Sequence, residues 1–399
     1  MKTAVDRYRA AAVITANALL LFLVVNLLAI PAARSRARQA AETGRDDEKL
    51  ARAYPGWPLE KIHELLDERD RLNQWEYEAF TEFRQKPVAG RFVNVDPVGF
   101  RKGRTGQRWP PVPAPCAVFV FGGSCAFGDR LPDEATIPAA LEDVLPPVPS
   151  CGRRAVYNFA RPSYFSTQER ILFEQLLASG VVPGIAIFID GLNEFLYEEP
   201  PEDGRLWRGA QTSELDALVR LESTSGTRQR FLRLLLGLPL VRYLRSFSPR
   251  EHRLPATARP GGCDPGRILA RWCANRRLIE GTASRFGVAP YFVWQPVPVY
   301  GYDVAFHVDG RLPATLDCVR EGYNAFAAMT PAEPPGSDFV WLADMQVARR
   351  ENLYVDAVHY TEAFSREIAR AIASAVAREP RDPPSFRSTD DTFPGPPPR

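Results

Sequence analysis

The sequence has little net charge and no cluster of unbalanced basic residues. Its 50 Lys and Arg are matched by 48 Asp and Glu, so the formal net charge is +2. Binding a polyanion such as nucleic acid requires clustered Lys and Arg without compensating acids. We therefore expect no nucleic-acid partner. The composition does not indicate an oligomeric state.

The cysteines and histidines also lack the spacings of a metal site. None of the 6 cysteines forms a Cys-x-x-Cys pair, and no cluster of Cys and His has zinc-ligand spacing. We expect neither a metal nor an organic cofactor. Cys116 and Cys151 each precede a predicted strand. They can form a disulfide if those strands are neighbours, which implies an oxidising compartment; the alternative is two unpaired thiols, and both stay open.

Charged residues are absent between Arg9 and Arg34, in a stretch that contains LLLFLVVNLLAI. The stretch is long enough to cross a hydrocarbon core as a helix. A cleaved signal peptide is the alternative. We favour an uncleaved single-pass anchor, because the run is long for a signal peptide and no clean Ala-x-Ala site follows it. Basic residues flank both ends, so the flanking charges leave the orientation open.

The chain divides into regions of different composition. Residues 1–33 form a cytoplasmic tip and the anchor, and residues 34–115 form a charged stalk and a lead-in segment. The main domain covers residues 116–379 and carries an insertion at 195–262. Residues 380–399 are rich in proline and have no apolar pattern, so we expect a disordered tail.

The lead-in segment and the insertion each contain an apolar pattern. Leu59–Phe83 is a predicted helix, with Ile62 and Leu65 among its apolar residues at helical spacing. Arg228–Phe247 is an apolar run with Arg on both flanks, which can lie on a bilayer surface. We favour instead a helix that packs on the domain or caps its cleft. Pro239 would break or kink a continuous helix in this run.

From Cys116 onward, predicted strands and helices alternate. The strands are Ala117–Gly123, Ala155–Phe159, Gly184–Asp190, Pro290–Pro296 and Phe339–Leu342. The helices are Ile137–Val144, Ser166–Leu177, Gly266–Phe286, Leu316–Ala328 and a last one after Thr361. This alternation requires parallel pairing through right-handed crossovers. We expect a three-layer α/β/α sandwich with a mainly parallel, flavodoxin-like sheet, and a site at the carboxyl ends of its strands.

Two of these helices begin at capping sequences. Ser166-Thr-Gln-Glu169 has the pattern of a capping box, in which the Glu side chain bonds back to the N-cap backbone. Thr361 is the expected N-cap of the last helix, whose apolar residues share one face. Both signals predict where a helix starts.

A serine follows the first strand of the main domain in the sequence FGGSCAFG. The two glycines before Ser124 permit a tight turn from which its hydroxyl can project. A serine hydroxyl needs a base, usually an imidazole, and the imidazole needs a carboxylate to orient it. Asp356 and His359 are three residues apart, so one turn of chain can present both. The other histidines have no acid partner at a useful spacing: His63, His252 and His307.

Acyl transfer also needs hydrogen-bond donors for the oxyanion of the tetrahedral intermediate. Asn193, after the third strand, can offer its side-chain amide, and the main-chain N–H groups of Ser124 and Ser163 can complete the set. We expect Cys125 to be a small packing residue rather than a thiol catalyst. Glu194 is either solvated or orients the oxyanion loop, and the sequence leaves that choice open.

In their order, these segments resemble the four blocks of the SGNH (GDSL-like) hydrolase superfamily. Gly122–Ser124 is similar to the first block, with Gly123 where the family usually has Asp. The run from Asn158 to Ser163 resembles the second block, with Ser163 in place of the oxyanion glycine. A main-chain N–H is the donor there, so serine can still supply it if the backbone angles allow.

The third and fourth blocks follow. Gly191-x-Asn193-Glu194 resembles the third, with Glu for the usual Asp, and Asp356-x-x-His359 matches the fourth. One block alone occurs often by chance, but four in order at predicted strand ends are a specific signal. The resemblance covers about Cys116–Arg378. An α/β-hydrolase fits less well, because its elbow needs Gly-x-Ser-x-Gly and Ala126 occupies the last position here.

The resemblance implies a membrane-anchored serine hydrolase that acts on ester bonds through an acyl-enzyme. Ser124 is then the nucleophile, His359 the base and later the acid, and Asp356 orients it, while Asn193 and Ser163 serve the oxyanion. Anchored relatives resemble proteins that act on O-acetylated envelope or exported polysaccharide. We therefore expect an acylated carbohydrate or small-molecule substrate and an extracytoplasmic (periplasmic) catalytic domain. An O-acyltransferase and a non-catalytic glycan-binding or scaffold member of the fold are the alternatives.

Overall fold

In the computed structural model, the N-terminal apolar segment and the alternating strands and helices belong to two different compact units. The residues it describes are 2–43, 46–103, 106–149, 152–196, 238–241, 263–329, 336 and 338–378. The chain divides into one unit formed by Met1–Leu50 with Gln211–Ala256, and a second formed by Ala51–Ala210 with Thr257–Arg399. Most of the predicted insertion, including nearly all of Arg228–Phe247, and the predicted tail lie outside the described residues.

The described residues of the first unit include the long helix α1 (Lys2–Thr43). Within it, Val5–Pro31 is long and apolar enough to cross a membrane, and 11% of its most apolar window is buried. A signal sequence near the N-terminus meets the same criteria of length and apolarity. The predicted apolar helix of membrane-spanning length is therefore present, and it continues past residue 33 into the region predicted as stalk.

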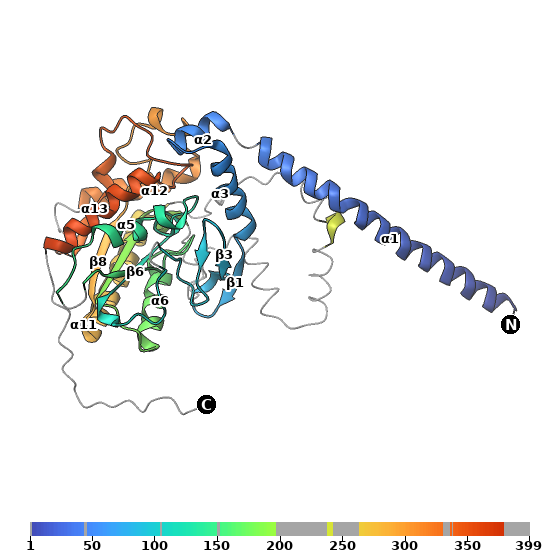
Figure 1. The fold of residues 1–399 in the computed structure, drawn as a ribbon, viewed down its shortest axis with the longest axis horizontal. Helices are drawn as coiled ribbons and strands as arrows, with labels where there is room; N and C mark the ends of the chain where they lie inside the picture. The colour runs from blue at the N-terminus through green and yellow to red at the C-terminus, as the bar shows by residue number, and fades with distance from the viewer. Residues whose placement is uncertain are drawn as a thin grey trace, which may run out of the picture. The chain divides into compact units, whose positions relative to one another are not determined.

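The second unit is built on a five-stranded sheet in the order β6-β5-β7-β8-β9. Figure 1 labels two of its strands, β6 and β8, among the helices of this unit. Its strands are β5 (Ala117–Gly122), β6 (Ala155–Asn158), β7 (Ile185–Asp190), β8 (Ala289–Trp294) and β9 (Phe339–Trp341). All four pairings are parallel. The predicted flavodoxin-like sheet is thus confirmed. The strand order reverses beside β5, so the carboxyl ends of β5 and β7 flank the crevice where such sheets place their sites.

Three helices cover one face of the sheet: α6 (Ser166–Ala178), α11 (Pro265–Phe286) and α12 (Asp317–Met329). On this face Phe121, Phe188 and Phe292 stack across β5, β7 and β8, with ring centroids 4.9 and 5.5 Å apart. Phe173 of α6 packs edge-on against this row. Trp272 of α11 packs in the same way against the next ring along β8.

The opposite face is covered by α5 (Ile137–Val144) and α13 (Glu362–Arg378), which pack on each other. Every residue of β5, β7 and β8 is buried, as expected for strands covered on both faces. Thr361 accepts a hydrogen bond from the N–H of Phe364 at 3.3 Å, so it caps α13 as predicted. The predicted apolar face of α13 is buried: Phe364, Ile368, Ile372 and Val376.

The lead-in segment differs from its prediction. The helix predicted over Leu59–Phe83 ends at Leu72, and a β-hairpin follows it. Here Trp75-Glu-Tyr-Glu alternates large and acidic residues with the period of a strand, and the ring of Trp75 packs edge-on against Phe83 at 5.5 Å. The elements of this segment are α2 (Asp47–Ala53), α3 (Leu59–Leu72), β1 (Trp75–Glu78), β2 (Glu82–Gln85), β3 (Val88–Ala89) and β4 (Asn94–Val95).

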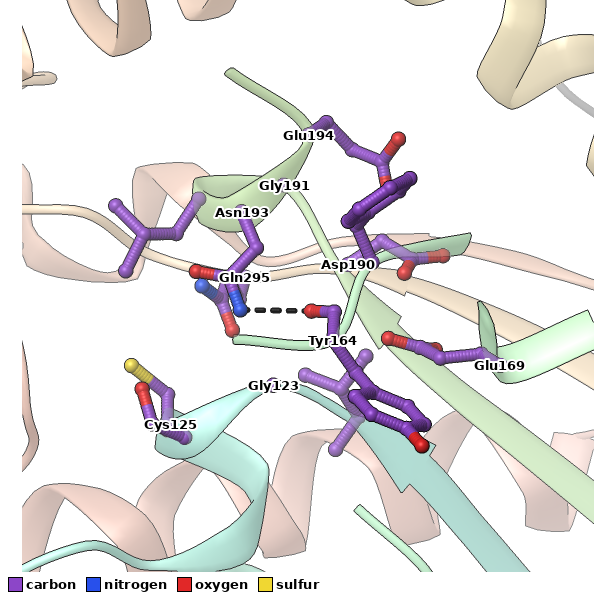
Figure 2. A pocket seen from close by; sticks show the side chains of 13 residues that line it. Gly123, Cys125, Tyr164, Glu169, Asp190, Gly191, Asn193, Glu194 and Gln295 are labelled. Carbon is purple, nitrogen blue, oxygen red and sulfur yellow. Dashed lines mark hydrogen bonds between the residues drawn. The ribbon is translucent and has the colours of Figure 1, made fainter. Parts of the chain in front are cut away.

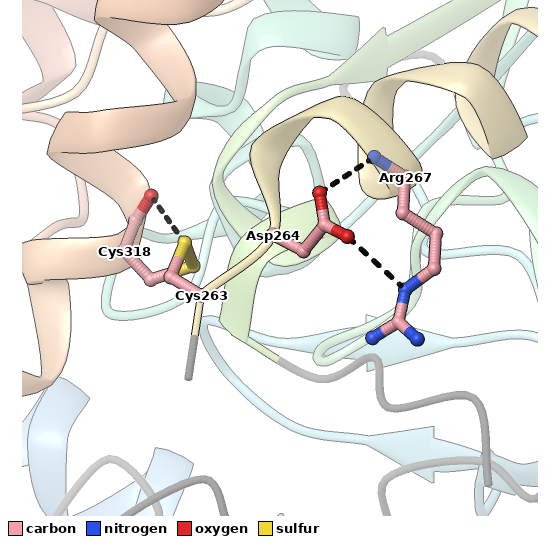
Figure 3. The surroundings of a disulfide bond; sticks show 4 residues. All are labelled: Cys263, Asp264, Arg267 and Cys318. Atoms are coloured by element: carbon pink, nitrogen blue, oxygen red, sulfur yellow. Dashed lines mark hydrogen bonds and ion pairs between the residues drawn. A yellow bond between two sulfur atoms is a disulfide. The ribbon is translucent and has the colours of Figure 1, made fainter. Parts of the chain in front are cut away.

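Disulfides join parts of the second unit. Cys263 and Cys318 bond across a sequence separation of 55, which ties the segment just before α11 to the first turn of α12 (Figure 3). Asp264, next to Cys263, accepts a hydrogen bond from the N–H of Arg267 at 3.0 Å and caps α11. Cys116 is also disulfide-bonded. Its predicted partner, Cys151, lies outside the described residues.

Candidate active site

Two short helices begin where β5 and β7 end, and they carry two of the predicted site residues. Ser124 is the first residue of α4 (Ser124–Phe127), and Asn193 lies in α7 (Leu192–Leu196). Gly122 has φ +153°, and a Cβ on it would lie 2.9 Å from the carbonyl oxygen of Ile189. Only glycine therefore fits at the point where the chain leaves the strand and turns into α4.

Gly123 is required by the close approach of Asn193. A Cβ on Gly123 would lie 2.1 Å from Nδ2 of Asn193 and 3.1 Å from the carbonyl oxygen of Tyr164. The same Nδ2 donates a hydrogen bond to that carbonyl at 2.7 Å (Figure 2). The structure thus brings the first three sequence blocks together. The glycine in place of the usual Asp leaves space for the Asn193 amide beside Ser124.

Ser163 occupies the third position of a tight turn. The N–H of Tyr164 donates to the carbonyl of Arg161 at 3.1 Å, with Pro162 and Ser163 between them. Ser163 has φ +68°, the left-handed conformation that a type II turn requires at this position and that glycine adopts most easily. The serine therefore takes the backbone conformation of the glycine it replaces. Among the described residues, none accepts a hydrogen bond from its N–H.

Asn158, the first residue of the second block, forms hydrogen bonds to two segments near Ser124. Its Nδ2 donates to the carbonyl of Phe127 at 3.2 Å, and its Oδ1 accepts from the N–H of Ala160 at 3.1 Å. The first bond holds the end of α4, and the second holds the start of the loop that leads to Ser163. One buried amide thus fixes two of the segments that surround Ser124.

Asp356 and His359 lie together on the loop before α13. Nδ1 of His359 is 2.9 and 2.8 Å from the two carboxylate oxygens of Asp356. Oδ1 of Asp356 also accepts from the main-chain N–H groups of Val358 at 3.1 Å and His359 at 2.9 Å. One turn of chain therefore presents both groups, with the carboxylate in the position that fixes the imidazole tautomer.

The loop with His359 reaches the helix with Ser124. The thiol of Cys125 donates to the carbonyl of Val358 at 3.4 Å, so the neighbours of Ser124 and His359 touch. No hydrogen bond joins Ser124 Oγ to His359 among the described residues, and Nε2 of His359 is buried without a hydrogen-bond partner. Burial raises the pKa of the Cys125 thiol, which therefore stays protonated and packs, as expected from the sequence.

Three charged residues beside His359 were not predicted from the sequence. Oδ2 of Asp129 lies 3.8 Å from Nε2 of His359. Arg69 of α3 donates to both oxygens of Asp129, at 2.8 and 2.6 Å. Nε of Arg130 lies 2.6 Å from Oδ2 of Asp356. Asp129 and Arg130 lie five and six residues after Ser124, which is a weak signal, and the sequence offers none for Arg69.

These neighbours set the charge state of the pair. Burial alone would raise the pKa of Asp356, but His359 and then Arg130 hold it well below its usual range. Burial alone would lower the pKa of His359, but Asp356 outweighs it and the pKa is raised. Burial also opposes ionisation of Asp129, and Arg69 overcomes it, so the pKa of Asp129 is lowered. Two ionised carboxylates therefore flank the imidazole at neutral pH.

Glu194 anchors the third block against α6. It is 1% exposed, and its carboxylate accepts from the N–H of Ser166 at 2.6 Å and from its Oγ at 3.0 Å. Arg271 donates to the same carboxylate at 3.0 Å. The predicted capping box is therefore wrong, because Glu194 takes the place that Glu169 was expected to fill. The burial of Glu194 excludes one of its two predicted roles, that of a solvated side chain.

Glu169 and Asp190 form a buried acidic pair in the pocket that Ser124 and Asn193 also line (Figure 2). Trp272 donates from Nε1 to Oδ2 of Asp190 at 2.9 Å. Burial and the nearby acids raise the pKa of Asp190 to about 8 and that of Glu169 well above its usual range. At neutral pH the pair therefore retains a proton. Within the described part of the chain, no group of acids, His and Cys could hold a metal ion.

Known proteins similar to this chain are found among solved structures. No family model matches the chain, and no curated protein matches it. Similar solved structures include a carbohydrate acetylesterase from Sinorhizobium meliloti, 13% identical, with a TM-score of 0.34 over 66% of this chain and 98% of that one. A member of the lipolytic G-D-S-L family from Veillonella parvula is 11% identical, with a TM-score of 0.33 over 66% of this chain and 96% of that one.

The second of these neighbours carries the G-D-S-L name of the class that the four sequence blocks resemble. Identities and TM-scores this low say nothing of activity. What the site can do therefore depends on the geometry of its own residues.

Proposed function

We propose that the chain is a serine esterase of the SGNH type, with Ser124 as its nucleophile. The observation that carries the proposal is the convergence of the four blocks at one edge of the sheet. Asn193 lies against Gly123, beside Ser124, and bonds to the residue after Ser163. The pairing of His359 with Asp356 reaches the same edge through the contact of Cys125 with Val358.

The proposed reaction begins with proton transfer. Nε2 of His359 takes the proton of Ser124 Oγ as the oxygen attacks the ester carbonyl, and Asp356 stabilises the imidazolium that forms. The tetrahedral intermediate then collapses, its C–O bond to the alcohol breaks, and His359 protonates the departing oxygen. Water, activated by the same nitrogen, attacks the acyl-enzyme, and the carboxylic acid leaves as Ser124 recovers its proton.

The oxyanion donors are held in place before substrate arrives. Nδ2 of Asn193 is fixed by its bond to Tyr164, and the backbone N–H groups of Ser124 and Ser163 have no acceptor among the described residues. Donors that need no reorganisation stabilise the developing charge most effectively. The left-handed conformation of Ser163 supports its assignment as a donor, because it is the conformation that the glycine of the second block would take.

We extend the proposal to an acyl ester, such as an acetyl ester, on an envelope or exported polysaccharide. The basis is the sequence resemblance to anchored hydrolases of this type. If a sugar hydroxyl replaces water in the second step, the same residues catalyse O-acyl transfer. A non-catalytic, glycan-binding role is the other candidate. It is favoured by one observation, the lack of a hydrogen bond between Ser124 Oγ and His359.

We further propose that α1 anchors the chain in a membrane with the catalytic unit on the extracytoplasmic side. The disulfide between Cys263 and Cys318 supports this, since disulfides persist in oxidising compartments. The segment Val5–Pro31 supplies the length and apolarity of a spanning helix. Protease added to intact spheroplasts should digest the catalytic unit. Protection that is lost only on lysis would place the unit in the cytoplasm.

The test of activity is labelling of the full-length protein by a fluorophosphonate probe, together with acetate release from acetylated glycans. Wild type is compared with Ser124→Ala and with Ser179→Ala, the same chemical change at an exposed serine at the end of α6. We expect both signals in wild type and Ser179→Ala and neither in Ser124→Ala. A folded wild type that shows neither would favour the glycan-binding role.

A further inference from the structure

His359 lies between two carboxylates, and only one of them belongs to the predicted triad. Asp356 bonds to Nδ1, on one side of the ring. Asp129 approaches from the other side, with its Oδ2 3.8 Å from Nε2. Nε2 is the nitrogen that would take the serine proton, and it is buried without a hydrogen-bond partner. Asp129 is therefore the carboxylate that forms an ion pair with the nitrogen that would gain the proton.

The position of Asp129 is fixed from two directions. Its N–H donates to the carbonyl of Ser124 at 3.0 Å, which ties it to the residue proposed as nucleophile. Arg69 binds both of its carboxylate oxygens, and the Asp129 side chain is 9% exposed. Gly128, before it, has φ +83°, and a Cβ there would lie 2.3 Å from Cγ2 of Thr136. The turn that brings Asp129 to His359 is thus held by hydrogen bonds at both ends and requires glycine at position 128.

The charges around the ring alternate in sign. Arg69 pairs with Asp129, and Arg130 pairs with Asp356. Because each carboxylate has its own guanidinium, both stay ionised and neither takes the proton from His359. The titratable and charged groups around the ring come from its own loop, from the turn after Ser124 and from the lead-in segment: Asp356, Cys125, Asp129, Arg130, Arg69 and Tyr54.

We propose that Asp129 is a positioning residue of this site: it holds the His359 ring with Nε2 toward the serine side and stabilises the imidazolium formed when His359 takes the Ser124 proton. The proposal rests on the esterase function proposed above. The Arg69 clamp keeps Asp129 an anion and sets its distance from Nε2. The raised pKa of His359, to which Asp129 contributes after Asp356, agrees with this arrangement.

Two substitutions that remove the same negative charge in different ways test the proposal. Asp129→Asn removes the negative charge facing Nε2, so the pKa of His359 should fall by about 0.5–1. Arg69→Gln removes the cation that keeps Asp129 ionised against its burial, so Asp129 loses its charge and the pKa of His359 should fall as well. Asp70→Asn is the matched control, because Asp70 is the exposed carboxylate on the other side of the same guanidinium and does not face His359. It should leave the pKa unchanged.

Two readouts on full-length protein separate this proposal from the proposed function. The pKa of His359 is measured by NMR of its ring, assigned with His359→Gln, and the acid limb of kcat/KM is measured with an activated acetyl ester. In Asp129→Asn we expect the acid limb to follow the pKa downward and the plateau to fall about tenfold. Arg69→Gln gives a second reading, of the same sign, should Asp129→Asn fail to fold.

The outcomes are distinct. An unchanged His359 pKa in both Asp129→Asn and Arg69→Gln overturns the proposal, whatever the activity. A uniform loss of kcat/KM without movement of the acid limb also overturns it, because that loss is what a purely structural role would produce. A wild type without esterase activity, whose His359 pKa still falls in Asp129→Asn, overturns the proposed function and supports the coupling of Asp129 to His359.

Discussion

Replacing Ser163 by glycine should stabilise the protein, although it removes a hydroxyl. Ser163 has φ +68°, and a residue with a Cβ in the left-handed region carries a cost of about 1–2 kcal/mol. Glycine removes that cost, but its greater freedom in the unfolded chain returns about 0.5–1 kcal/mol. The free energy of unfolding should therefore rise by about 0.5–1 kcal/mol.

The assay is thermal unfolding of the full-length protein in detergent, with three substitutions at the one position. Ser163→Gly should raise Tm by about 1–4 °C, given the size of the unit that unfolds. Ser163→Ala keeps a Cβ, so it should change Tm little. Ser163→Val, which adds a β-branched side chain to the same backbone conformation, should lower Tm below that of the Ala variant.

The three variants at Ser163 also distinguish the cost of its left-handed backbone conformation from its role in binding the oxyanion. The backbone N–H is present in every variant, so the rate of labelling by a fluorophosphonate should stay within about threefold in the Gly and Ala variants. A Gly variant that is less stable than the wild type, or a Val variant as stable as it, would refute the left-handed conformation and with it the match to a glycine of the second block. A labelling rate that depends on the side chain would refute the assignment of the main-chain donor.

Three further predictions follow from contacts of the second unit. Gly123→Ala should lower kcat/KM by about 100-fold or more, measured with the activated acetyl ester, because the new Cβ would displace the amide of Asn193. The pKa of Asp190 is raised to about 8 in the folded protein, against about 4 in the unfolded chain. The folded state therefore binds a proton that the unfolded state has lost between pH 4 and 8, and the free energy of unfolding should fall as pH rises through this range. Urea unfolding should show this fall in wild type and a smaller one in Asp190→Asn. Cys318→Ser opens the loop of 55 residues that Cys263 closes and should cost about 4 kcal/mol in urea, less if the reduced chain retains structure.

The parts of the fold that the sequence predicted correctly are those with strong local signals. The fully apolar runs of β5, β7 and β8 were located to within two residues, since strands buried on both faces have continuous apolar sequences. The pairing of His359 with Asp356 could be predicted for a similar reason, because three residues of chain suffice to bring them together. Ser124 was identified by the glycines that its turn requires.

Contacts between distant segments were not predictable. Arg69 and Asp129 are 60 residues apart, and neither helical periodicity nor strand alternation relates them. The capping of α6 failed for the same reason, since Glu194 reaches Ser166 from another strand end while the nearby Glu169 turns into the pocket. In both cases the interaction comes from a carboxylate that is distant in sequence. Helical and strand periodicity relate only residues that are close in sequence, so they could not predict either contact.

The segment before the main domain contributes side chains that contact the turn after Ser124 and that belong to none of the four sequence blocks. Arg69 of α3 holds Asp129, and the hydroxyl of Tyr54 donates to the carbonyl of Arg130 at 2.9 Å. A shortened protein that starts at Cys116 would keep every block and lose both of these side chains. Any fragment prepared for crystallography or kinetics should therefore begin no later than Ala51, where the second unit itself begins.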